Sequence, residues 1–303
     1  MSVEREQSYA ARAVHVGLIG AGIQHSSSPA LHMDEGRALG LDYRYDILDL
    51  DRMAGGADAL ASVLDDVQSQ GFAGVNVTYP CKQSVIPLLD ELTDDARSLQ
   101  SVNTVVFRGG RRIGHNTDWW GFAESFRRGM TDVLRDRVVL VGAGGAGSAV
   151  GYAMLQLGAK SLQVFDVDPA RARTLAARHA ELFPRAQVGA LDDLTRALRG
   201  ADGLVHASPT GMAKLPGIPV PPASLRPPLW VAEVVYVPLE TELLRVARHQ
   251  GCRTLDGGGM AVFQAAMAFE QFCGRRPDAE RMLRRFNESL RGAAAAPDPA
   301  DAR

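Results

Sequence analysis

The stretch Val138-Val-Leu-Val-Gly-Ala-Gly-Gly-Ala-Gly147 decides the fold of the middle of this chain. Its first four residues form an apolar run typical of a buried strand, and Ser148–Leu157 has the pattern of the helix that follows. Gly142, Gly144 and Gly147 have the G-x-G-x-x-G spacing. This spacing permits a tight turn, a close approach of the backbone to a pyrophosphate, and close packing of helix on strand. Because a helix N-terminus also offers free N–H groups to phosphates, the stretch predicts a dinucleotide-binding turn.

An acidic residue after the next predicted strand bears on which dinucleotide is bound. Leu162–Phe165 is that strand, and Asp166 lies at its end, about 20 residues beyond the glycines. A carboxylate there accepts hydrogen bonds from ribose hydroxyls and repels a 2′-phosphate, so NAD is favoured and NADP is the second candidate. Arg171 and Arg173 lie in the following helix, which Asp168 is expected to cap. Either arginine is a candidate for a phosphate contact, although surface arginines on an amphipathic helix are the ordinary interpretation.

Length and composition restrict the class of protein. A chain of 303 residues with a net charge of −2 has the size for two domains and lacks the positive charge of a nucleic-acid-binding protein. Cys81, Cys252 and Cys273 form neither a C-x-x-C pair nor a zinc pattern, so we expect no metal site and a reducing, cytoplasmic setting. No apolar run approaches the roughly 20 residues that span a bilayer, and the N-terminus lacks the apolar core of a secretion signal. We therefore expect neither a membrane nor a nucleic acid as partner; the oligomeric state stays open, with a homodimer as one candidate.

Strand and helix patterns alternate along the chain and predict an α/β fold with two domains. The first segment is expected to hold strands at Val14–Ile19, Tyr43–Ile47 and Gly74–Val77, helices at Pro29–Leu39, Ala57–Gln70 and Gln83–Leu89, and a hairpin of Val102–Phe107 with Arg111–Ile113. Later elements are expected at Trp119–Arg128, Gly203–His206, Trp230–Val235, Gly258–Phe272 and Asp278–Leu290. We assign residues 1–118, completed by helices within 258–290, to a small α/β substrate domain. Residues 119–257 form a Rossmann-type, doubly wound dinucleotide-binding domain, and residues 291–303 a disordered tail.

Polar residues gather where predicted strands of the first domain end. Ser26 and Ser28 precede Pro29, at the start of a predicted helix. Helix capping explains these serines, and so does the binding of a small carboxylate by two hydroxyls and a helix N-terminus. The sequence leaves both interpretations open.

Three further polar residues are candidates for chemistry. Lys82 lies just past the third strand, where a solvated surface lysine is the ordinary interpretation. Asp118 is in a position to cap a helix. Asn103 interrupts an apolar strand and needs hydrogen-bond partners if it is buried. Spacing alone does not show that the three meet in space.

Short motifs follow one another in a specific order over about residues 14–290. They are Gly17-Leu-Ile-Gly20, His25-Ser-Ser-Ser-Pro29 with His32, Asn76-Val-Thr-Tyr-Pro-Cys-Lys82, Val102-Asn103-Thr104, Asn116-Thr-Asp118 with Gly121, Gly142-Ala-Gly-Gly-Ala-Gly147, Gly211-Met212, Tyr236-Val-Pro238, and Met260 with Gln264. In this order they resemble the shikimate dehydrogenase family, including its quinate/shikimate dehydrogenase branch. Each motif is short, but their combined order is specific.

The resemblance implies an NAD(P)-dependent oxidoreductase that oxidises the C3 hydroxyl of shikimate to 3-dehydroshikimate, reversibly. Quinate/shikimate and aminoshikimate dehydrogenases are the alternatives. The implied catalytic pair is Lys82 with Asp118. The substrate carboxylate would be held by Ser26, Ser28 and Tyr236, and the ring hydroxyls would be bound by Asn76, Thr78, Asn103, Asp118 and Gln264.

The cofactor site is expected to include the whole glycine-rich turn and four residues that follow it. Met212 is implied to pack near the nicotinamide. The full set is Gly142, Ala143, Gly144, Gly145, Ala146, Gly147, Asp166, Arg171, Met212 and Gly257.

Some positions depart from the family's pattern. His206 stands where an Asn is common, Glu233 where an Asp is usual, and Gln100 where a Gly is usual. We interpret His206 as a satisfied polar group at a strand end rather than a second base. The run from Phe165 through Asp166 looks like the NAD-using branch, whereas Ser28 looks more like a shikimate site than a quinate site.

Two other functions remain as alternatives. Methylenetetrahydrofolate dehydrogenases also place a lysine near a dinucleotide domain, but they lack the Ser26/Ser28 and Asn116-Thr-Asp118 patterns. A dinucleotide-sensing regulatory protein would bind the ligand without turnover. The presence of both Lys82 and Asp118 argues against that second alternative.

Overall fold

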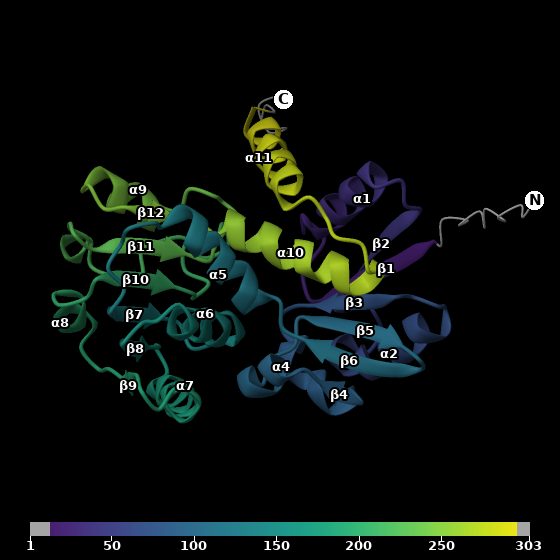
Figure 1. Ribbon diagram of the computed structural model, residues 1–303, viewed down its shortest axis with the longest axis horizontal. Coiled ribbons are helices and arrows are strands. Elements are labelled where there is room, and N and C mark those ends of the chain that lie inside the picture. The colour runs from purple at the N-terminus through teal and green to yellow at the C-terminus, as the bar shows by residue number, and fades with distance from the viewer. Residues whose placement is uncertain (1–12, 296–303) are drawn as a thin grey trace, which may run out of the picture.

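The computed structural model describes residues 13–295 and shows two lobes, each built around its own sheet (Figure 1). The sheet of the first lobe has the spatial order β2 (Tyr43–Asp49), β1 (Val14–Gly20), β3 (Gly74–Val77), β5 (Thr104–Arg108), β6 (Arg111–His115) and β4 (Glu91–Leu92). Strands β2, β1 and β3 run parallel, β5 is antiparallel to β3, and β6 is antiparallel to β5. The carboxyl ends of β1, β3 and β6 and the start of β5 therefore lie at one edge of the sheet.

The helices of the first lobe are short. They are α1 (Ser28–Ala38), α2 (Leu60–Ser69), α3 (Cys81–Ser84) and α4 (Asp94–Leu99), with single 3₁₀ turns at Leu50–Arg52, Gly56–Ala59 and Ile86–Leu88. Helix α1 follows β1, and α3 follows β3. Both helices therefore begin at the edge of the sheet where those strands end.

The sheet of the second lobe is parallel throughout. Its spatial order is β12 (Thr254–Leu255), β11 (Trp230–Glu233), β10 (Gly203–His206), β7 (Arg137–Val141), β8 (Ser161–Phe165) and β9 (Gln187–Ala190). Its helices are α6 (Gly145–Gln156), α7 (Pro169–Leu182), α8 (Leu194–Leu198) and α9 (Glu242–His249), and a 3₁₀ turn spans Pro222–Ser224. Numbered along the chain, the strands have the 3-2-1-4-5-6 order of a Rossmann-type sheet. The predicted doubly wound α/β fold is confirmed.

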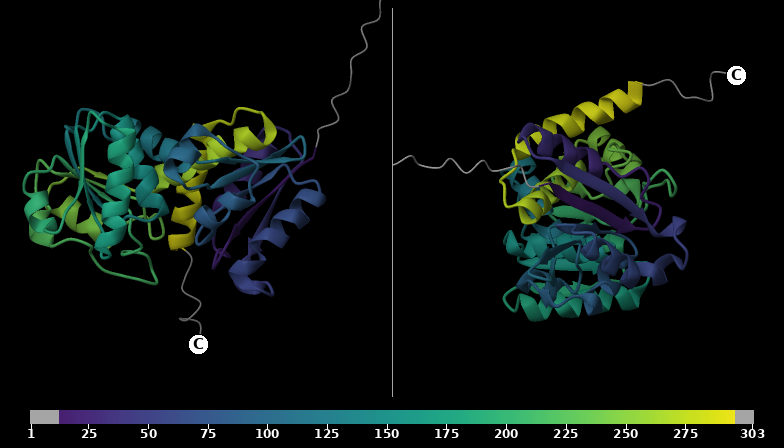
Figure 2. Two further views of the ribbon diagram at one scale, coloured as in Figure 1. Left: turned by 90° about the horizontal axis from the view of Figure 1, so that it is seen from below. Right: turned by 90° about the vertical axis from the view of Figure 1, so that its right-hand side faces the viewer.

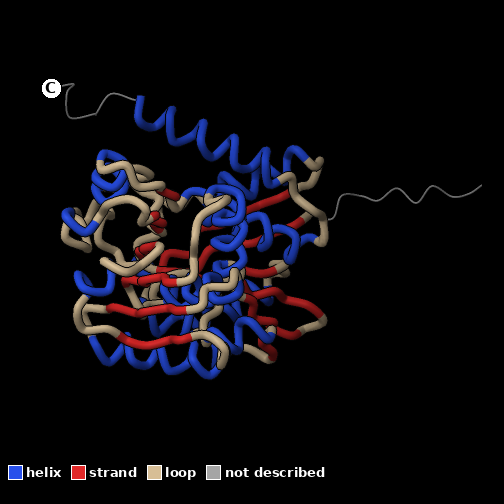
Figure 3. Tube along the Cα trace, turned by 60° about the vertical axis from the view of Figure 1, so that its left-hand side comes forward, coloured by secondary structure: helices blue, strands red, loops and turns tan. Residues whose placement is uncertain are grey.

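The apolar run of β7 explains why helices cover both faces of this sheet. Val138 and Leu140 point into one buried cluster, which includes residues of α6. Val139 and Val141 point into another, which includes residues of α9. Successive side chains of a strand face opposite sides, so an unbroken apolar run demands cover on both faces. Figure 3 shows the strands flanked by helices.

Two helices run between the lobes, α5 (Asp118–Gly129) and α10 (Gly258–Cys273), and they pack against each other (Figures 1 and 2). The contact is close because α5 carries Gly121, where an added Cβ would lie 2.7 Å from the backbone nitrogen of Gln264. The last helix, α11 (Ala279–Ala295), is tied to α1 by Arg281, whose guanidinium lies 2.7 Å from the carboxylate of Glu35. None of the helices within residues 13–295 has the length and apolar character needed to cross a membrane.

Some elements differ from those that the sequence predicted. The helix expected at Gln83–Leu89 is two short pieces, α3 and the 3₁₀ turn that follows it. The pattern did not reveal β4, α4, β9, α8, α9 or β12, most of which are too short to show a periodicity. Helix α11 continues to Ala295, so the start of the expected tail is helical, as its alanines favour. The rest of that tail lies outside the described residues.

Candidate active site

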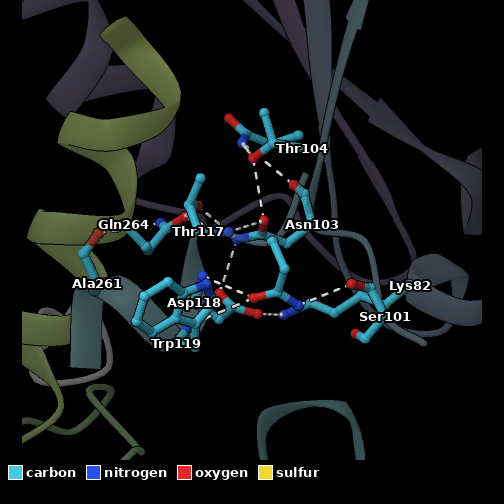
Figure 4. A network of polar contacts seen from close by, with 11 residues as sticks. Lys82, Ser101, Asn103, Thr104, Thr117, Asp118, Trp119, Ala261 and Gln264 are labelled. Atoms are coloured by element: carbon cyan, nitrogen blue, oxygen red, sulfur yellow. Dashed lines mark hydrogen bonds and ion pairs between the residues drawn. The ribbon is translucent and has the colours of Figure 1, made fainter. Parts of the chain in front are cut away.

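Lys82 and Asp118, which are 36 positions apart in the sequence, meet at the edge of the first sheet. The Nζ atom of Lys82 lies 2.5 Å from Oδ2 of Asp118 (Figure 4). Lys82 belongs to α3, directly after β3, and Asp118 begins α5, directly after β6. Because β3 and β6 run in the same direction, their carboxyl ends carry the two side chains to one place. Asp118 is buried and Lys82 is partly buried, so the pair is shielded from bulk water on most sides.

Asn103 fixes the other oxygen of the Asp118 carboxylate. Its Nδ2 atom donates to Oδ1 of Asp118 at 2.9 Å and to Oγ1 of Thr117 at 2.8 Å, with Oε1 of Gln264 farther away at 3.4 Å. The Oδ1 atom of Asn103 accepts hydrogen bonds from the backbone N–H of Thr117 at 2.7 Å and from the hydroxyl of Thr104 at 3.2 Å. Asn103 is buried, and these contacts supply the partners that the sequence analysis required of it.

Helix capping, the ordinary explanation of Asp118, does not apply in the structure. Asp118 is the first residue of the helix, and Thr117 precedes it without a side-chain cap. Instead, Oδ1 of Asn116 accepts from the backbone N–H groups of Asp118 at 3.1 Å and Trp119 at 3.4 Å. The Nδ2 atom of Asn116 donates to the carbonyl of Ser101 at 2.9 Å. Because Asn116 satisfies the end of the helix, the carboxylate of Asp118 is free to hold Lys82.

The serines of the first loop lie at the same edge of the sheet, after β1. The hydroxyls of Ser26 and Ser28 are 3.2 Å apart, and Ser26 accepts a long hydrogen bond, 3.3 Å, from the backbone N–H of Ser28. Ser27 is the N-cap of α1 but makes no side-chain cap. Thr78 packs over this loop, since a Cβ on Gly20 would lie 2.4 Å from its methyl group. Both half-buried serine hydroxyls therefore lie near the start of α1 without capping it in the usual way.

Tyr45 is a residue of the site that the sequence analysis missed. Its hydroxyl donates to Oδ1 of Asn76 at 2.8 Å, and Nδ2 of Asn76 donates to Oγ1 of Thr104 at 3.0 Å. Burial raises the pKa of Tyr45, while a hydrogen bond with Ser28 lowers it. Its position within a strand of alternating aromatic residues looks like an ordinary core position, and no motif distinguishes it. The hydroxyl connects the serine loop with Asn76.

Tyr236 approaches this group of residues from the second lobe, where it follows β11. Burial raises the pKa of its phenol, and the negative charge of Asp118 raises it further. Its ring packs on Phe286 of α11, with the ring centroids 6.3 Å apart. The charge of Asp118 thus acts on Tyr236, although 118 positions separate the two residues in the sequence.

The glycine-rich turn between β7 and α6 has the geometry of a phosphate cradle. Gly142 has a φ of +106°, and a Cβ there would lie 2.7 Å from the carbonyl carbon of Ala207. A Cβ on Gly147 would lie 1.9 Å from the carbonyl oxygen of Gly142. By contrast, a Cβ on Gly144 or Gly145 meets nothing closer than 3.5 Å. The turn is thus closed behind, where Gly142 and Gly147 are tightly packed, and open in front, at Gly144 and Gly145. The first N–H groups of α6 have no acceptor within the helix.

Two of the cofactor candidates beyond the turn, Asp166 and Arg171, lie next to it. Asp166 accepts hydrogen bonds from the backbone N–H of Ala143 at 2.7 Å and from that of Asp168 at 2.9 Å. Asp168 caps α7 as predicted, through the N–H of Ala170. Arg171 extends from α7 over the turn, and its guanidinium lies 3.7 Å from the position of a Cβ on Gly144.

Met212 and Gly257 lie at the carboxyl end of the second sheet. Met212 is 43% exposed and forms an isolated bridge with Leu215. Gly257 comes so close to the end of β11 that a Cβ would lie 2.3 Å from the carbonyl oxygen of Val234. Packing alone therefore requires a glycine at this position.

The two halves of the site face each other. A Cβ on Gly145, in the open front of the turn, would lie 3.6 Å from Cδ of Lys82 and 3.5 Å from the hydroxyl of Ser101. Two hydrogen bonds to the carbonyl of Leu99, from Ser148 at 3.3 Å and from Arg178 at 3.2 Å, hold the end of α4 against the second lobe. The ammonium–carboxylate pair is therefore placed beside the surface that can hold a dinucleotide.

Comparisons with known proteins agree with this architecture. A family model described as the shikimate dehydrogenase substrate binding domain matches residues 18–105. A shikimate dehydrogenase (NADP(+)) from Streptomyces avermitilis is 55% identical over 92% of this chain and 97% of its own length. A quinate/shikimate dehydrogenase (NAD(+)) from Corynebacterium efficiens is 46% identical over 89% of this chain and 96% of its own.

The likeness extends to three dimensions. The structure of quinate dehydrogenase from Corynebacterium glutamicum in complex with NAD superimposes with a TM-score of 0.87, at 42% identity, over 91% of this chain and 99% of that one. Sequence identity of this extent, together with the shared fold, is decisive. The chain belongs to the shikimate dehydrogenase family.

Proposed function

We propose that the protein is an NAD(P)-dependent shikimate dehydrogenase, which oxidises the C3 hydroxyl of shikimate to a ketone and reverses that reaction. The observation that carries the proposal is the contact of Lys82 with Asp118, 2.5 Å, beside the open face of the glycine-rich turn. An acid–base pair next to a dinucleotide cradle is what an alcohol dehydrogenase needs. A protein that only senses the dinucleotide has no use for a buried ammonium–carboxylate pair of this kind.

The Lys82–Asp118 pair handles the proton of the reacting hydroxyl. In the oxidation direction, the neutral amine of Lys82 takes the proton of the hydroxyl at Nζ and becomes the ammonium group that Asp118 holds. In the reduction direction, that ammonium group donates the proton to the carbonyl oxygen and becomes the amine again. A nicotinamide cofactor, when bound, would supply the redox chemistry, which is the exchange of a hydride with the carbinol carbon. Positioned acid–base groups of this kind contribute about 10²–10⁴-fold to a rate.

Asp118 acts by holding Lys82, and neighbouring residues hold Asp118 in turn. One carboxylate oxygen faces the ammonium group and the other accepts from Asn103. Asn116 anchors the first turn of α5. We therefore assign Asn103 two tasks, contact with a ring hydroxyl and orientation of the carboxylate. Such support from a second layer of side chains fixes the reacting groups to within a fraction of an ångström.

The substrate is held by neutral donors rather than by an arginine. The hydroxyls of Ser26 and Ser28 lie beside the start of α1, and we assign them, with Tyr236, to the substrate carboxylate. Asn76, Thr78 and Gln264 are assigned to the ring hydroxyls. A site built to hydrogen-bond hydroxyls rejects analogues that lack them, because its own buried polar groups are then left unpaired. This property suits a polyhydroxylated ring acid.

The turn fits a dinucleotide, and Asp166 favours NAD over NADP. Backbone N–H groups of the turn and of α6 would hold the pyrophosphate, with Arg171 above them. The carboxylate of Asp166 accepts a hydrogen bond from the N–H of Ala143 in the turn, and a negative charge after this strand repels a 2′-phosphate. The relatives named above divide between the two cofactors, NADP in Streptomyces and NAD in Corynebacterium, so the local charge is the stronger argument.

The experiment that tests the proposal is steady-state kinetics with shikimate and with quinate, each against NAD and NADP, followed through the absorbance of the reduced nicotinamide. We expect turnover of shikimate with a lower KM for NAD than for NADP. Turnover of quinate at a similar kcat/KM would place the protein among the quinate/shikimate dehydrogenases. No turnover with either substrate and either cofactor would overturn the proposal.

The free state of all three cysteines supports a reducing compartment, and we place the enzyme in the cytoplasm.

A further inference from the structure

Two of the departures from the family's pattern turn out to be neighbours. His206, at the end of β10, and Glu233, at the end of β11, are both buried, and Nδ1 of the histidine lies 2.8 Å from Oε1 of the glutamate. On the other side of the ring, Nε2 lies 2.5 Å from the hydroxyl of Ser208. The three residues thus form a continuous chain of polar contacts from a buried carboxylate to a half-buried hydroxyl.

The surroundings of Glu233 determine which atom is the donor in each of these hydrogen bonds. Its Oε1 atom accepts from the backbone N–H groups of Val234 at 3.0 Å and Val235 at 3.1 Å, and Oε2 accepts from the hydroxyl of Thr241 at 3.2 Å. A carboxylate surrounded by donors acts as an acceptor toward His206 as well. The neutral imidazole then carries its proton on Nδ1, and its Nε2 is an acceptor. The hydroxyl of Ser208 must therefore donate its proton to Nε2.

Ser208 lies at the point of the second sheet where a cofactor is expected to cross. The strand order reverses between β7 and β10, and ligands of open α/β sheets bind at the carboxyl ends of the strands beside such a reversal. Ala207 continues the pairing past the end of β10, since its N–H donates to the carbonyl of Val141 at 2.7 Å. A Cβ on Gly142 would lie 2.7 Å from the backbone nitrogen of Ser208. The serine is thus in contact with the glycine-rich turn.

We propose that Glu233 and His206 are positioning residues that turn the Ser208 hydroxyl so that its oxygen accepts a hydrogen bond from the nicotinamide half of the cofactor. With its proton on His206, the oxygen keeps its lone pairs, and one of them receives only a long contact, 3.4 Å, from the N–H of Thr210. The nicotinamide half carries two kinds of donor, the carboxamide N–H and the ribose hydroxyls. The same order of contacts, carboxylate to histidine to serine, orients the nucleophilic serine of hydrolases. In this protein the serine lies where the cofactor is expected to bind, and we assign it to cofactor binding.

The proposal rests on dinucleotide binding, and its test measures that binding and the histidine itself. In the protein without cofactor, ¹⁵N NMR of the imidazoles should show His206 protonated at Nδ1 alone, with the signal assigned by its loss in His206→Asn. Glu233→Met keeps the length of the side chain but removes the oxygen that accepts from Nδ1, a position that a glutamine oxygen would keep because Val234 and Val235 also donate there. We expect the proton to move to Nε2, which reverses the hydroxyl of Ser208. A doubly protonated ring in the unsubstituted protein would overturn the proposal.

The second measurement is the Kd of NADH, from fluorescence titration of Ser208→Ala, Glu233→Met and the double variant. Each single substitution should weaken NADH binding by about fivefold, the loss of one hydrogen bond. Glu233→Met should add nothing in the Ser208→Ala background, because its effect passes through the hydroxyl. Additive losses would overturn the proposal. Failure of the unsubstituted protein to bind NADH would instead contradict the proposed function.

Two controls separate orientation from stability and identify the donor. Thr241→Val disturbs the same carboxylate from its other oxygen and should lower the melting temperature while leaving the Kd of NADH unchanged. A weakening of NADH binding in this variant as large as that in Glu233→Met would indicate a merely structural role and overturn the proposal. With 3-acetylpyridine adenine dinucleotide, which lacks the carboxamide N–H, the effect of Ser208→Ala should vanish if the carboxamide is the donor and persist if a ribose hydroxyl is.

Discussion

The two halves of the site are made from different parts of the polypeptide. In the first lobe, side chains make the site: Asp118 is 5% exposed, and both of its oxygens are held, by Lys82 and by Asn103. In the second lobe, the backbone makes it: a turn whose glycines bring main-chain atoms within contact distance. Removing one side chain should therefore be enough to inactivate the first half. The second half should instead be impaired when a side chain is added to a glycine of the turn.

The largest effect is expected from Lys82→Ala. Removing the ammonium group deletes the proposed proton carrier, so kcat should fall by about 10²–10⁴-fold. The KM for NAD should stay within about twofold, since a group used only in the reacting step does not contribute to ground-state binding. Steady-state kinetics with shikimate and NAD measures both quantities.

The matched control is Lys160→Ala. This lysine also pairs with an aspartate, Asp136, at 2.7 Å, but its side chain is 75% exposed and belongs to the second lobe. Its removal should leave kcat unchanged. Near-normal turnover in Lys82→Ala, or an equal loss in the control, would remove Lys82 from the mechanism.

The second prediction concerns two glycines of the same turn. A Cβ on Gly144 has room, with the guanidinium of Arg171 at 3.7 Å, but it occupies the open front of the turn. Gly144→Ala should therefore fold normally and raise the KM for NAD by about tenfold, because the backbone can no longer approach the pyrophosphate. A Cβ on Gly147 would instead lie 1.9 Å from the carbonyl oxygen of Gly142.

Gly147→Ala should therefore lower the stability of the second lobe, by about 1–3 kcal/mol for an overpacked contact. Thermal unfolding monitored by circular dichroism, together with NAD kinetics, distinguishes the two variants. If Gly144→Ala unfolds and Gly147→Ala does not, our assignment of the front and back of the turn is wrong.

A smaller effect is expected at Asp166, a side chain that contributes to a site otherwise made of backbone. Asp166→Ala removes the partner of the Ala143 N–H and the expected acceptor for the ribose hydroxyls. The KM for NAD should rise by about fivefold, one or two lost hydrogen bonds, while the KM for NADP should stay constant or fall. The quantity to measure is thus the ratio of the KM for NAD to the KM for NADP.

Arg171→Ala serves as the comparison for Asp166. Its guanidinium lies over the turn, where we expect it to contact the pyrophosphate that both cofactors share, so its loss should raise the KM of both cofactors to the same extent. A rise confined to NADP would show that Arg171 contacts the 2′-phosphate instead.

The same contrast explains what the sequence could predict. The turn at Gly142–Gly147 was predictable because its requirements are local: glycines at fixed spacing between a strand and a helix. The convergence of Lys82 with Asp118 was not, because it depends on β3 and β6 running in the same direction, and only the resemblance to a family supplied it. Tyr45 escaped notice because a strand aromatic looks like core. The sequence also left open whether Asp118 serves only as a helix cap, because Asn116 and Asp118 are equally good capping residues.

The smallest effect is expected where the two halves join, at Gln100. This residue ends α4 with a φ of +50°, next to the Leu99 carbonyl that both Ser148 and Arg178 contact. A left-handed backbone costs a residue with a Cβ about 1–2 kcal/mol of stability. A glycine avoids this cost, but its greater freedom in the unfolded chain cancels part of the gain. Gln100→Gly should therefore raise the stability by about 0.5–1 kcal/mol and leave the kinetic constants unchanged.

Gln250 offers a matched control for that substitution. It also ends a helix, α9, but with a φ of −86°, so it holds no strain that a glycine could relieve. Gln250→Gly should lower the melting temperature, whereas Gln100→Gly should raise it by about 1–2 °C. If both substitutions lower it, the hydrogen bond from the Gln100 side chain to the carbonyl of Arg97 outweighs the backbone strain. The side chain, and not the backbone, would then stabilise the junction between the lobes.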